Sequence, residues 1–180
     1  GFRMGPFELI DAIGADINLA VSESVFEQFF FDSRYRPNPL QRTLVDASRL
    51  GRKSGAGFYD YGSDGSRGAP WPKLARHSAG PRIEGLTDER IGERVLATIV
   101  NEAASAVAEG IAAPNAIDTA MRLGANYPAG PLEWGERIGL AHVVRLLEAL
   151  HAEVPDGRYR VVPLLRSLAT QSGSFFAAGG

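Results

Sequence analysis

The chain has 180 residues, and its 19 basic and 21 acidic side chains give a formal net charge of −2. It contains no cysteine, which excludes disulfide bonds, thiol nucleophiles and metal sites built on cysteine ligands. This charge is too low for a typical binder of nucleic-acid phosphates, and no apolar run is long enough to span a membrane, so we expect a cytoplasmic protein that binds neither.

The first predicted elements are two consecutive helices near the start of the chain. Gly5, Pro6 and Glu8 form a helix start, because proline suits the first helical position and an acid suits the first turn. Gly14 is predicted to end this helix, and Asp16 to cap the next one. The buried stripe of the second helix is predicted to be Ile17, Ala20, Val21, Ser24, Val25 and Phe29.

A third helix is predicted to begin at Asn38 and Pro39 and to run to Leu50, where a glycine-rich basic loop follows. Arg52 and Lys53 in this loop have two interpretations. They can hold a phosphate group together with backbone amides, or they can complement the negative end of the preceding helix. The sequence alone favours neither interpretation.

Residues 62–84 are rich in glycine and proline and show no periodicity, so they are predicted to form a linker. The best strand candidate, residues 57–61, is too short and isolated to build a sheet. The fold is therefore expected to be all-α.

Helices are also predicted throughout the second half of the chain. Thr87 caps a long helix that closes at Gly110. Its predicted buried stripe comprises Ile91, Val95, Thr98, Ile99, Glu102, Ala103, Ala106 and Val107. The remaining predicted helices cover residues 115–123, 131–138, 141–152 and 163–170.

The strongest signal in the sequence is an internal repeat. Residues 5–14 (GPFELIDAIG) return 125 residues later as 130–139 (GPLEWGERIG). Residues 34–42 (RYRPNPLQR) return 124 residues later as 158–166 (RYRVVPLLR). Two blocks in the same order and at nearly the same offset indicate a duplicated structural unit.

The repeat predicts the domain organisation. We expect a first repeat over residues 1–61, the linker over 62–84 and a second repeat over 85–180. A long helix precedes the repeated block in the second copy but not in the first. The chain is therefore expected to be the C-terminal part of a longer protein, cut inside its first repeat.

Two acid pairs, Glu8 with Asp11 and Glu133 with Glu136, lie three residues apart on predicted helices. Such pairs can act as general acid and base. Carboxylates in a first helical turn more often bond the amides that the helix leaves free, however. We therefore interpret both pairs as structural.

Two other polar features have competing interpretations. The Arg-Tyr-Arg sequence at residues 34–36 recurs at 158–160 before a helix start, so it is interpreted as a structural joint rather than an anion clamp. Asn101 lies inside the long helix, where asparagine is unfavourable unless its amide is used. It either fixes a neighbouring backbone segment or contacts a substrate.

Common motifs of self-contained active sites are missing from the sequence. Two of the three histidines, His142 and His151, lie nine residues apart on opposite faces of one predicted helix, so they cannot share a metal ion. The segment from Gly55 to Asp60 lacks the third glycine and the preceding strand of a dinucleotide-binding fingerprint. No metal site is expected.

Several segments together resemble the C-terminal domain of 3-hydroxyacyl-CoA dehydrogenases. These segments are GPFELID (5–11), GRKSGAGFY (51–59), VNEA (100–103), IDTAM (117–121) and GANYPAGP (124–131). The resemblance implies two tandem copies of this helical domain, whose fold is similar to the C-terminal domain of 6-phosphogluconate dehydrogenase. Tandem copies are typical of the longer bacterial members, which act in fatty-acid or phenylacetate breakdown.

The resemblance implies an enzyme that oxidises (S)-3-hydroxyacyl-CoA to 3-oxoacyl-CoA and passes a hydride to NAD. In this family a Rossmann domain binds NAD and supplies a His–Glu pair for proton transfer. The 180 residues contain neither feature. We therefore expect no catalytic residue, no NAD binding and no activity in this part of the protein alone.

In this family the helical domain covers the acyl-CoA and forms a dimer interface. The resemblance therefore implies that the turn formed by Met4, Gly5, Pro6 and Phe7 contacts the substrate. It also matches Asn101 with a substrate-contacting asparagine of the family. A homodimer is expected for the same reason.

The second repeat departs from the family pattern, because its basic loop has shrunk to residues 171–176. It is therefore expected to be a packing partner rather than a second working half. A first repeat without its opening helix should expose apolar side chains such as Phe26, Phe29 and Phe30, which predicts a homodimer or cover by the second repeat. Two alternatives to the function implied by the resemblance are the C-terminal region of another NAD-dependent hydroxy-acid dehydrogenase and a purely structural dimerisation module.

Overall fold

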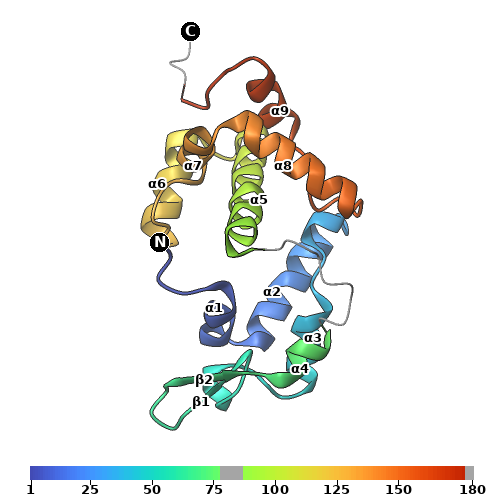
Figure 1. The fold of residues 1–180 in the computed structure, drawn as a ribbon, viewed down its shortest axis with the longest axis vertical. Helices are drawn as coiled ribbons and strands as arrows, with labels where there is room; N and C mark the ends of the chain where they lie inside the picture. The colour runs from blue at the N-terminus through green and yellow to red at the C-terminus, as the bar shows by residue number, and fades with distance from the viewer. Residues whose placement is uncertain (78–86, 177–180) are drawn as a thin grey trace. The chain divides into compact units, whose positions relative to one another are not determined.

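The computed structural model describes residues 1–77 and 87–176. It divides the chain into two compact units, an N-terminal unit (Arg3–Glu84) and a C-terminal unit (Gly1–Phe2 with Gly85–Gly180). Helices dominate both units (Figure 1), which confirms the predicted all-α class. The predicted boundaries at residues 61 and 84 stay predictions.

The N-terminal unit contains short helices and one small sheet. Its helices are α1 (Pro6–Ile13), α2 (Ala15–Gln28), α3 (Pro39–Asp46) and α4 (Pro72–His77). Strands β1 (Tyr59–Tyr61) and β2 (Arg67–Pro70) pair antiparallel. Single 3₁₀ turns cover Ser33–Tyr35 and Arg52–Ser54. The core of the unit is formed by Ala15, Leu44, Phe58 and Trp71.

The C-terminal unit is built around one long helix. Its helices are α5 (Asp88–Ala108), α6 (Pro114–Gly124), α7 (Pro131–Ile138), α8 (Leu140–Glu153) and α9 (Pro163–Thr170). Helix α5 packs against α7, α8 and α9. Fully buried leucine and valine side chains, among them Val100, Leu147 and Leu165, form the core between these helices.

The internal repeat of the sequence is also a repeat of backbone geometry. Helices α1 to α3 follow one another as α7 to α9 do, and α2 and α8 both have 14 residues. The glycine between the first two helices has φ 111° and ψ 127° at Gly14, and φ 95° and ψ 117° at Gly139. After the third helix, Ser48 and Ser172 both have positive φ, at 56° and 52°.

Some predicted elements differ from the structure. The predicted linker is partly folded, because β2 and α4 lie within it, while its residues 78–84 lie outside the described part of the chain. The third helix ends at Asp46 rather than Leu50. Helix α2 begins directly after Gly14 with no side-chain cap, so Asp16 lies inside its first turn and does not cap it.

The predicted buried stripes of α2 and α5 are largely wrong. In α2, Ile17 and Val21 are 51% and 57% exposed, and the buried residues are Ala15 and Leu19. In α5, Ile91 and Val95 are each 44% exposed, and the buried residues are Ala97, Val100, Asn101, Ala103, Ala104 and Ser105. Helix α5 therefore packs mostly through small side chains, which permit close approach of neighbouring helices.

Candidate functional site

The turn that precedes α1 lies at the surface of the N-terminal unit. The side chains of Met4 and Phe7 are 40% and 48% exposed, and Gly5 and Pro6 are also exposed. The Phe7 ring stacks on the ring of buried Phe58, with centroids 4.4 Å apart and planes inclined by 21°. The turn is therefore accessible, and it is anchored by one aromatic contact.

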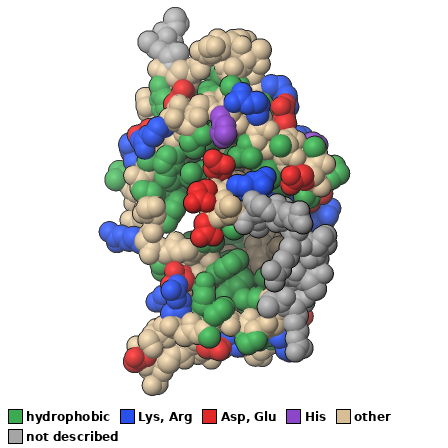
Figure 2. Space-filling view, viewed as in Figure 1, with side chains coloured by type: hydrophobic (Ala, Val, Ile, Leu, Met, Phe, Trp, Pro, Cys, Tyr) green, Lys and Arg blue, Asp and Glu red, His purple; other side chains and the backbone are tan. Residues whose placement is uncertain are grey.

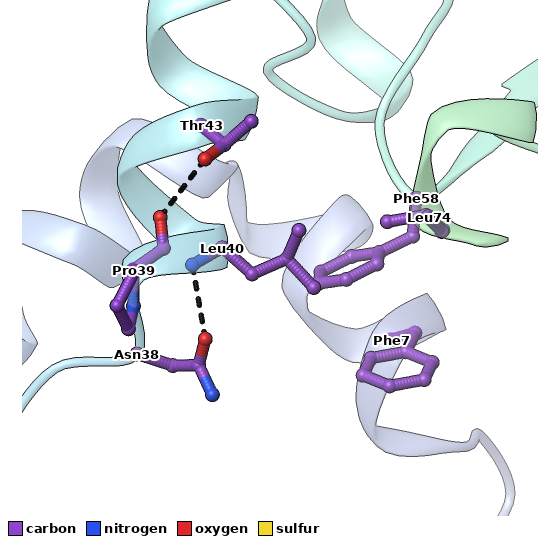
Figure 3. Close-up of a pocket in the computed structure, with 7 residues that line it drawn as sticks. All are labelled: Phe7, Asn38, Pro39, Leu40, Thr43, Phe58 and Leu74. Carbon is purple, nitrogen blue, oxygen red and sulfur yellow. Dashed lines mark hydrogen bonds between the residues drawn. The ribbon is translucent and has the colours of Figure 1, made fainter. Parts of the chain in front are cut away.

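Phe7 forms one wall of a pocket of about 470 Å³ (Figure 3). Helix α3 contributes its first turn to the pocket, and Phe58 and Leu74 come from the end of the basic loop and from α4. Figure 3 shows the Leu40 side chain directed at the Phe58 ring. The lining residues carry no formal charge: Phe7, Asn38, Pro39, Leu40, Thr43, Phe58 and Leu74. The pocket therefore suits an uncharged group with apolar surface.

A buried carboxylate holds Phe58 in place. Asp11 is 1% exposed and accepts hydrogen bonds from the amides of Phe58 (2.8 Å) and Tyr59 (3.0 Å) and from the Tyr61 hydroxyl (3.0 Å). Burial and the neighbouring Asp11 carboxylate raise the pKa of Tyr61 above its ordinary value. Asp11 therefore fixes the chain segment that forms the pocket wall, a role that the sequence did not indicate.

The glycines of the basic loop permit this contact. A Cβ atom at Gly57 would lie 2.0 Å from Oδ1 of Asp11. At Gly51, φ is 99°, and a Cβ atom would lie 2.2 Å from the carbonyl oxygen of Asp11. Any side chain at either position would push the loop off α1.

Internal hydrogen bonds fix the conformation of the basic loop, and the role of Arg52 and Lys53 in phosphate contact stays a prediction. The amides of Gly51, Ser54, Gly55 and Ala56 donate to carbonyl groups within the loop. The ammonium of Lys53 lies 2.7 Å from Oδ2 of Asp16, and this hydrogen bond lowers the pKa of Asp16 below its ordinary value. Arg52 lies over the Tyr61 ring, with its guanidinium carbon 5.6 Å from the centroid. Because α3 ends at Asp46, neither cation lies at its last turn.

Asn101, the matching candidate in the second repeat, is 2% exposed. Its Nδ2 donates to the carbonyl of Arg160 (3.0 Å), and its Oδ1 accepts from the amide of Val162 (3.0 Å). These two bonds fix the backbone segment that leads into α9, as the first of the two interpretations expects, and contact with a substrate stays a prediction.

Each acid pair contains one acid that caps its own helix and one that accepts an amide from a distant segment. Glu8 accepts from the amide of Gly5, and Glu133 from that of Gly130, which confirms the structural interpretation of these acids. Glu136 accepts the amide of Phe175 (2.7 Å), as Asp11 accepts amides in the first repeat.

One buried acid was missed entirely by the sequence analysis. Asp118 on α6 is 4% exposed and accepts the amides of Leu132 (2.8 Å) and Glu133 (2.9 Å) at the start of α7. It comes from a different helix than the one it caps, so no local spacing revealed it.

The joints before α3 and α9 have the same construction. The amide of Arg34 donates to Asp32, and the amide of Arg158 donates to Asp156, both at 3.0 Å. This shared local bonding agrees with the interpretation of the Arg-Tyr-Arg sequences as structural joints.

The expected apolar exposure is present in the N-terminal unit. Phe29 and Phe30 are 44% and 93% exposed, while Phe26 is half-buried. Within residues 1–77 and 87–176, no three histidine or acidic side chains form a group suited to a metal ion. None of the helices described there is both long and apolar enough to cross a membrane.

Comparisons with known proteins place these features in a family. The family model of the 3-hydroxyacyl-CoA dehydrogenase C-terminal domain matches residues 1–61 and 91–174. A 3-hydroxyadipyl-CoA dehydrogenase of Escherichia coli is 33% identical, over 94% of this chain and 51% of the relative. The alpha subunit of a fatty acid oxidation complex from Shewanella amazonensis is 30% identical, over 98% of this chain and 25% of the relative.

A solved structure shows the same fold. The crystal structure of a 3-hydroxybutyryl-CoA dehydrogenase from Escherichia coli matches with a TM-score of 0.75 and 32% identity, over 95% of this chain and 52% of that one. The chain thus spans about half the length of these two Escherichia coli proteins. The family model matches both repeats, so the chain belongs to the family of 3-hydroxyacyl-CoA dehydrogenase C-terminal domains.

Proposed function

We propose that the protein is a dehydrogenase that oxidises (S)-3-hydroxyacyl-CoA to 3-oxoacyl-CoA with NAD. The 180 residues form its substrate-covering and dimerisation region. The observation that carries this proposal is the match of both repeats to one family model. The named activities of the relatives, on 3-hydroxyadipyl-CoA and in fatty acid oxidation, agree with the substrate class.

The residues described do not fit NAD. The segment nearest to a dinucleotide fingerprint, Gly55–Asp60, uses the amides of Gly55, Ala56 and Gly57 for bonds to neighbouring carbonyls, and those of Phe58 and Tyr59 for bonds to Asp11. A pyrophosphate would find no free row of amides there. We place NAD and the catalytic pair in other parts of the whole protein, and we assign no catalytic step to this chain.

The role proposed for this chain is to position the acyl-CoA. The exposed turn Met4–Phe7 and the uncharged pocket behind Phe7 supply an apolar surface. The polar side chain of Asn38, at the start of α3, also lines this pocket. An apolar pocket with few polar groups is the usual form of a small-molecule site. We assign the turn and the pocket to the uncharged part of the thioester substrate, and not to its phosphates.

The activity test uses the whole protein encoded by the gene. With (S)-3-hydroxybutyryl-CoA and NAD it should produce NADH, followed by absorbance at 340 nm, whereas free 3-hydroxybutyrate should give no turnover. The 180-residue chain alone should not bind NADH in a calorimetric titration. Turnover of the free acid, or micromolar NADH binding by the chain alone, would contradict the proposal.

The substitution Phe7→Ala tests the pocket. Removing the ring opens one wall of the pocket, so KM for the acyl-CoA in the whole protein should rise about tenfold, a loss of roughly 1.4 kcal/mol of binding. Leu9→Ala is the matched control, because Leu9 is 45% exposed on the same helix and does not line the pocket. Unchanged turnover and KM in the Phe7 variant would favour a purely structural module.

A further inference from the structure

The pocket behind Phe7 has few polar groups with which to hold a charged ligand. Among the seven described side chains that line it, two are polar, those of Asn38 and Thr43. The Thr43 hydroxyl donates to the carbonyl of Pro39 (3.1 Å), and Oδ1 of Asn38 accepts the amide of Leu40 (2.9 Å). These bonds leave Nδ2 of Asn38 as the remaining donor of the lining side chains. One neutral donor does not replace the water that a carboxylate loses on burial.

The start of α3, which forms part of the wall, does not supply further donors. Free amides at a helix start commonly bind anions. In α3, however, the amide of Asn38 donates to Oε1 of Gln41 (2.7 Å), and the amide of Gln41 donates to the carbonyl of Asn38 (2.9 Å). The amide of Leu40 is bonded to the Asn38 side chain, and Pro39 has no amide hydrogen. The amides of the first turn are therefore occupied.

Two cations adjoin lining residues in the sequence, and both have partners elsewhere in the unit. Arg42 forms an ion pair with Glu23. The ammonium of Lys73 lies 5.5 Å from the centroid of the Trp71 ring. Neither cation lines the pocket. A negatively charged group in the pocket would therefore meet no positive charge in the wall to offset its desolvation.

The exposed surface of α1, the helix that carries Phe7, is also mostly apolar. Phe7, Leu9 and Ile13 are 48%, 45% and 48% exposed, and Figure 2 shows hydrophobic side chains at the surface over this helix. The charge of Glu8 is paired with Arg67 at 2.8 Å. The pocket therefore adjoins apolar surface on the side of α1.

These observations favour a hydrocarbon ligand. The CoA arm of the substrate carries amides and a hydroxyl that need several polar partners, whereas an alkyl chain needs none. We propose that the pocket binds the hydrocarbon end of the acyl chain and rejects acyl chains that end in a carboxylate, with position 43 on α3 as a point that sets this selection. The inference rests on the proposed function and narrows its substrate class to acyl chains without a second carboxylate.

Two substrates of equal chain length test the selection in the whole protein. (S)-3-Hydroxyhexanoyl-CoA ends in a methyl group, whereas 3-hydroxyadipyl-CoA has a carboxylate at the same carbon. With NAD present and NADH followed at 340 nm, kcat/KM should be at least tenfold higher for the hexanoyl substrate. The difference should lie mainly in KM, since the pocket is remote from the bonds that react.

The substitution Thr43→Lys tests whether this pocket is where the selection occurs. It adds a cation to the wall, so the ratio of the two kcat/KM values should move at least tenfold toward the adipyl substrate. Thr43→Met is the matched control, because it loses the same hydroxyl and adds a long side chain without charge; its ratio should stay within about threefold of wild type. Asn38→Lys adds a cation at an exposed lining position and should move the ratio in the same direction.

The possible results separate the inference from the proposed function. Turnover of both substrates with kcat/KM values within threefold, or faster turnover of the adipyl substrate, would overturn the inference and leave the dehydrogenase activity standing. A ratio that stays unchanged in both lysine variants would also overturn it, because the selection would then lie outside this pocket. Absence of turnover with either substrate would instead overturn the proposed function, and the inference with it.

Discussion

Replacing Asp11 by alanine should lower the free energy of unfolding of the N-terminal unit by about 3 kcal/mol. The substitution leaves the amides of Phe58 and Tyr59 and the Tyr61 hydroxyl without their acceptor, and the first of these is buried. Asp11→Asn should lower the free energy of unfolding somewhat less, because one acceptor oxygen remains. Some loss is still expected, since the new amide group faces backbone donors.

Urea unfolding followed by tryptophan fluorescence measures this effect in one unit at a time. The chain has two tryptophans, one in each unit. In a Trp134→Phe background, Trp71 reports on the core of the N-terminal unit, where it packs with Phe58. The midpoint of the Trp71 transition should fall in the Asp11 variants.

The internal repeat supplies the control for Asp11. Glu136 holds the equivalent position and accepts one amide, that of Phe175, so Glu136→Gln should cost less than about 1 kcal/mol. If Asp11→Ala changed the unfolding free energy no more than Glu136→Gln does, the carboxylate would not be what secures the pocket wall.

Helix starts were predictable because their chemistry is local. The structure begins α1, α7 and α9 at the prolines that the sequence predicted, Pro6, Pro131 and Pro163. Proline has the backbone angle of a first helical residue and lacks the amide that this position leaves free. These signals lie within a few residues of each element.

Buried faces were less predictable because packing decides them. The sequence stripe of α5 included its bulky residues Ile91 and Val95, but the helix buries alanines against its neighbours. Likewise, β1 lies within the strand candidate at residues 57–61, but its partner β2 was missed, because a four-residue strand rich in exposed and small residues carries no pattern of its own. Tertiary contacts select among faces that periodicity leaves equivalent.

In the candidate site, too, local features were predictable and long-range contacts were not. The turn at Phe7 was indicated by the family resemblance, but the carboxylates that hold the surrounding chain, Asp11 and Asp118, were not. Asp11 bonds amides 47 and 48 residues away, and Asp118 caps a helix other than its own. The repeat held one usable signal, since Asp11 and Glu136 are acids at equivalent positions and both accept loop amides.

The substitution Asn101→Ala should destabilise the C-terminal unit by about 2 kcal/mol, because it removes the acceptor of the buried Val162 amide and a donor to the part-buried Arg160 carbonyl. Asn101→Asp keeps the acceptor but sets a carboxylate against the Arg160 carbonyl, so it should be no better tolerated. In a Trp71→Phe background, Trp134 reports on this unit, where it packs against the core.

The control for Asn101 is Ser105→Ala, one turn further along α5. Its hydroxyl donates to Glu109 rather than to a distant backbone segment, so its loss should cost less than about 1 kcal/mol. In the whole protein, under conditions in which the variant stays folded, Asn101→Ala should keep kcat/KM for the acyl-CoA within about threefold of wild type. This is expected because a purely structural bond does not change the stabilisation of the transition state. A folded Asn101 variant that lost more than tenfold in kcat/KM would instead make this asparagine a substrate contact, and the second repeat a working half of the site.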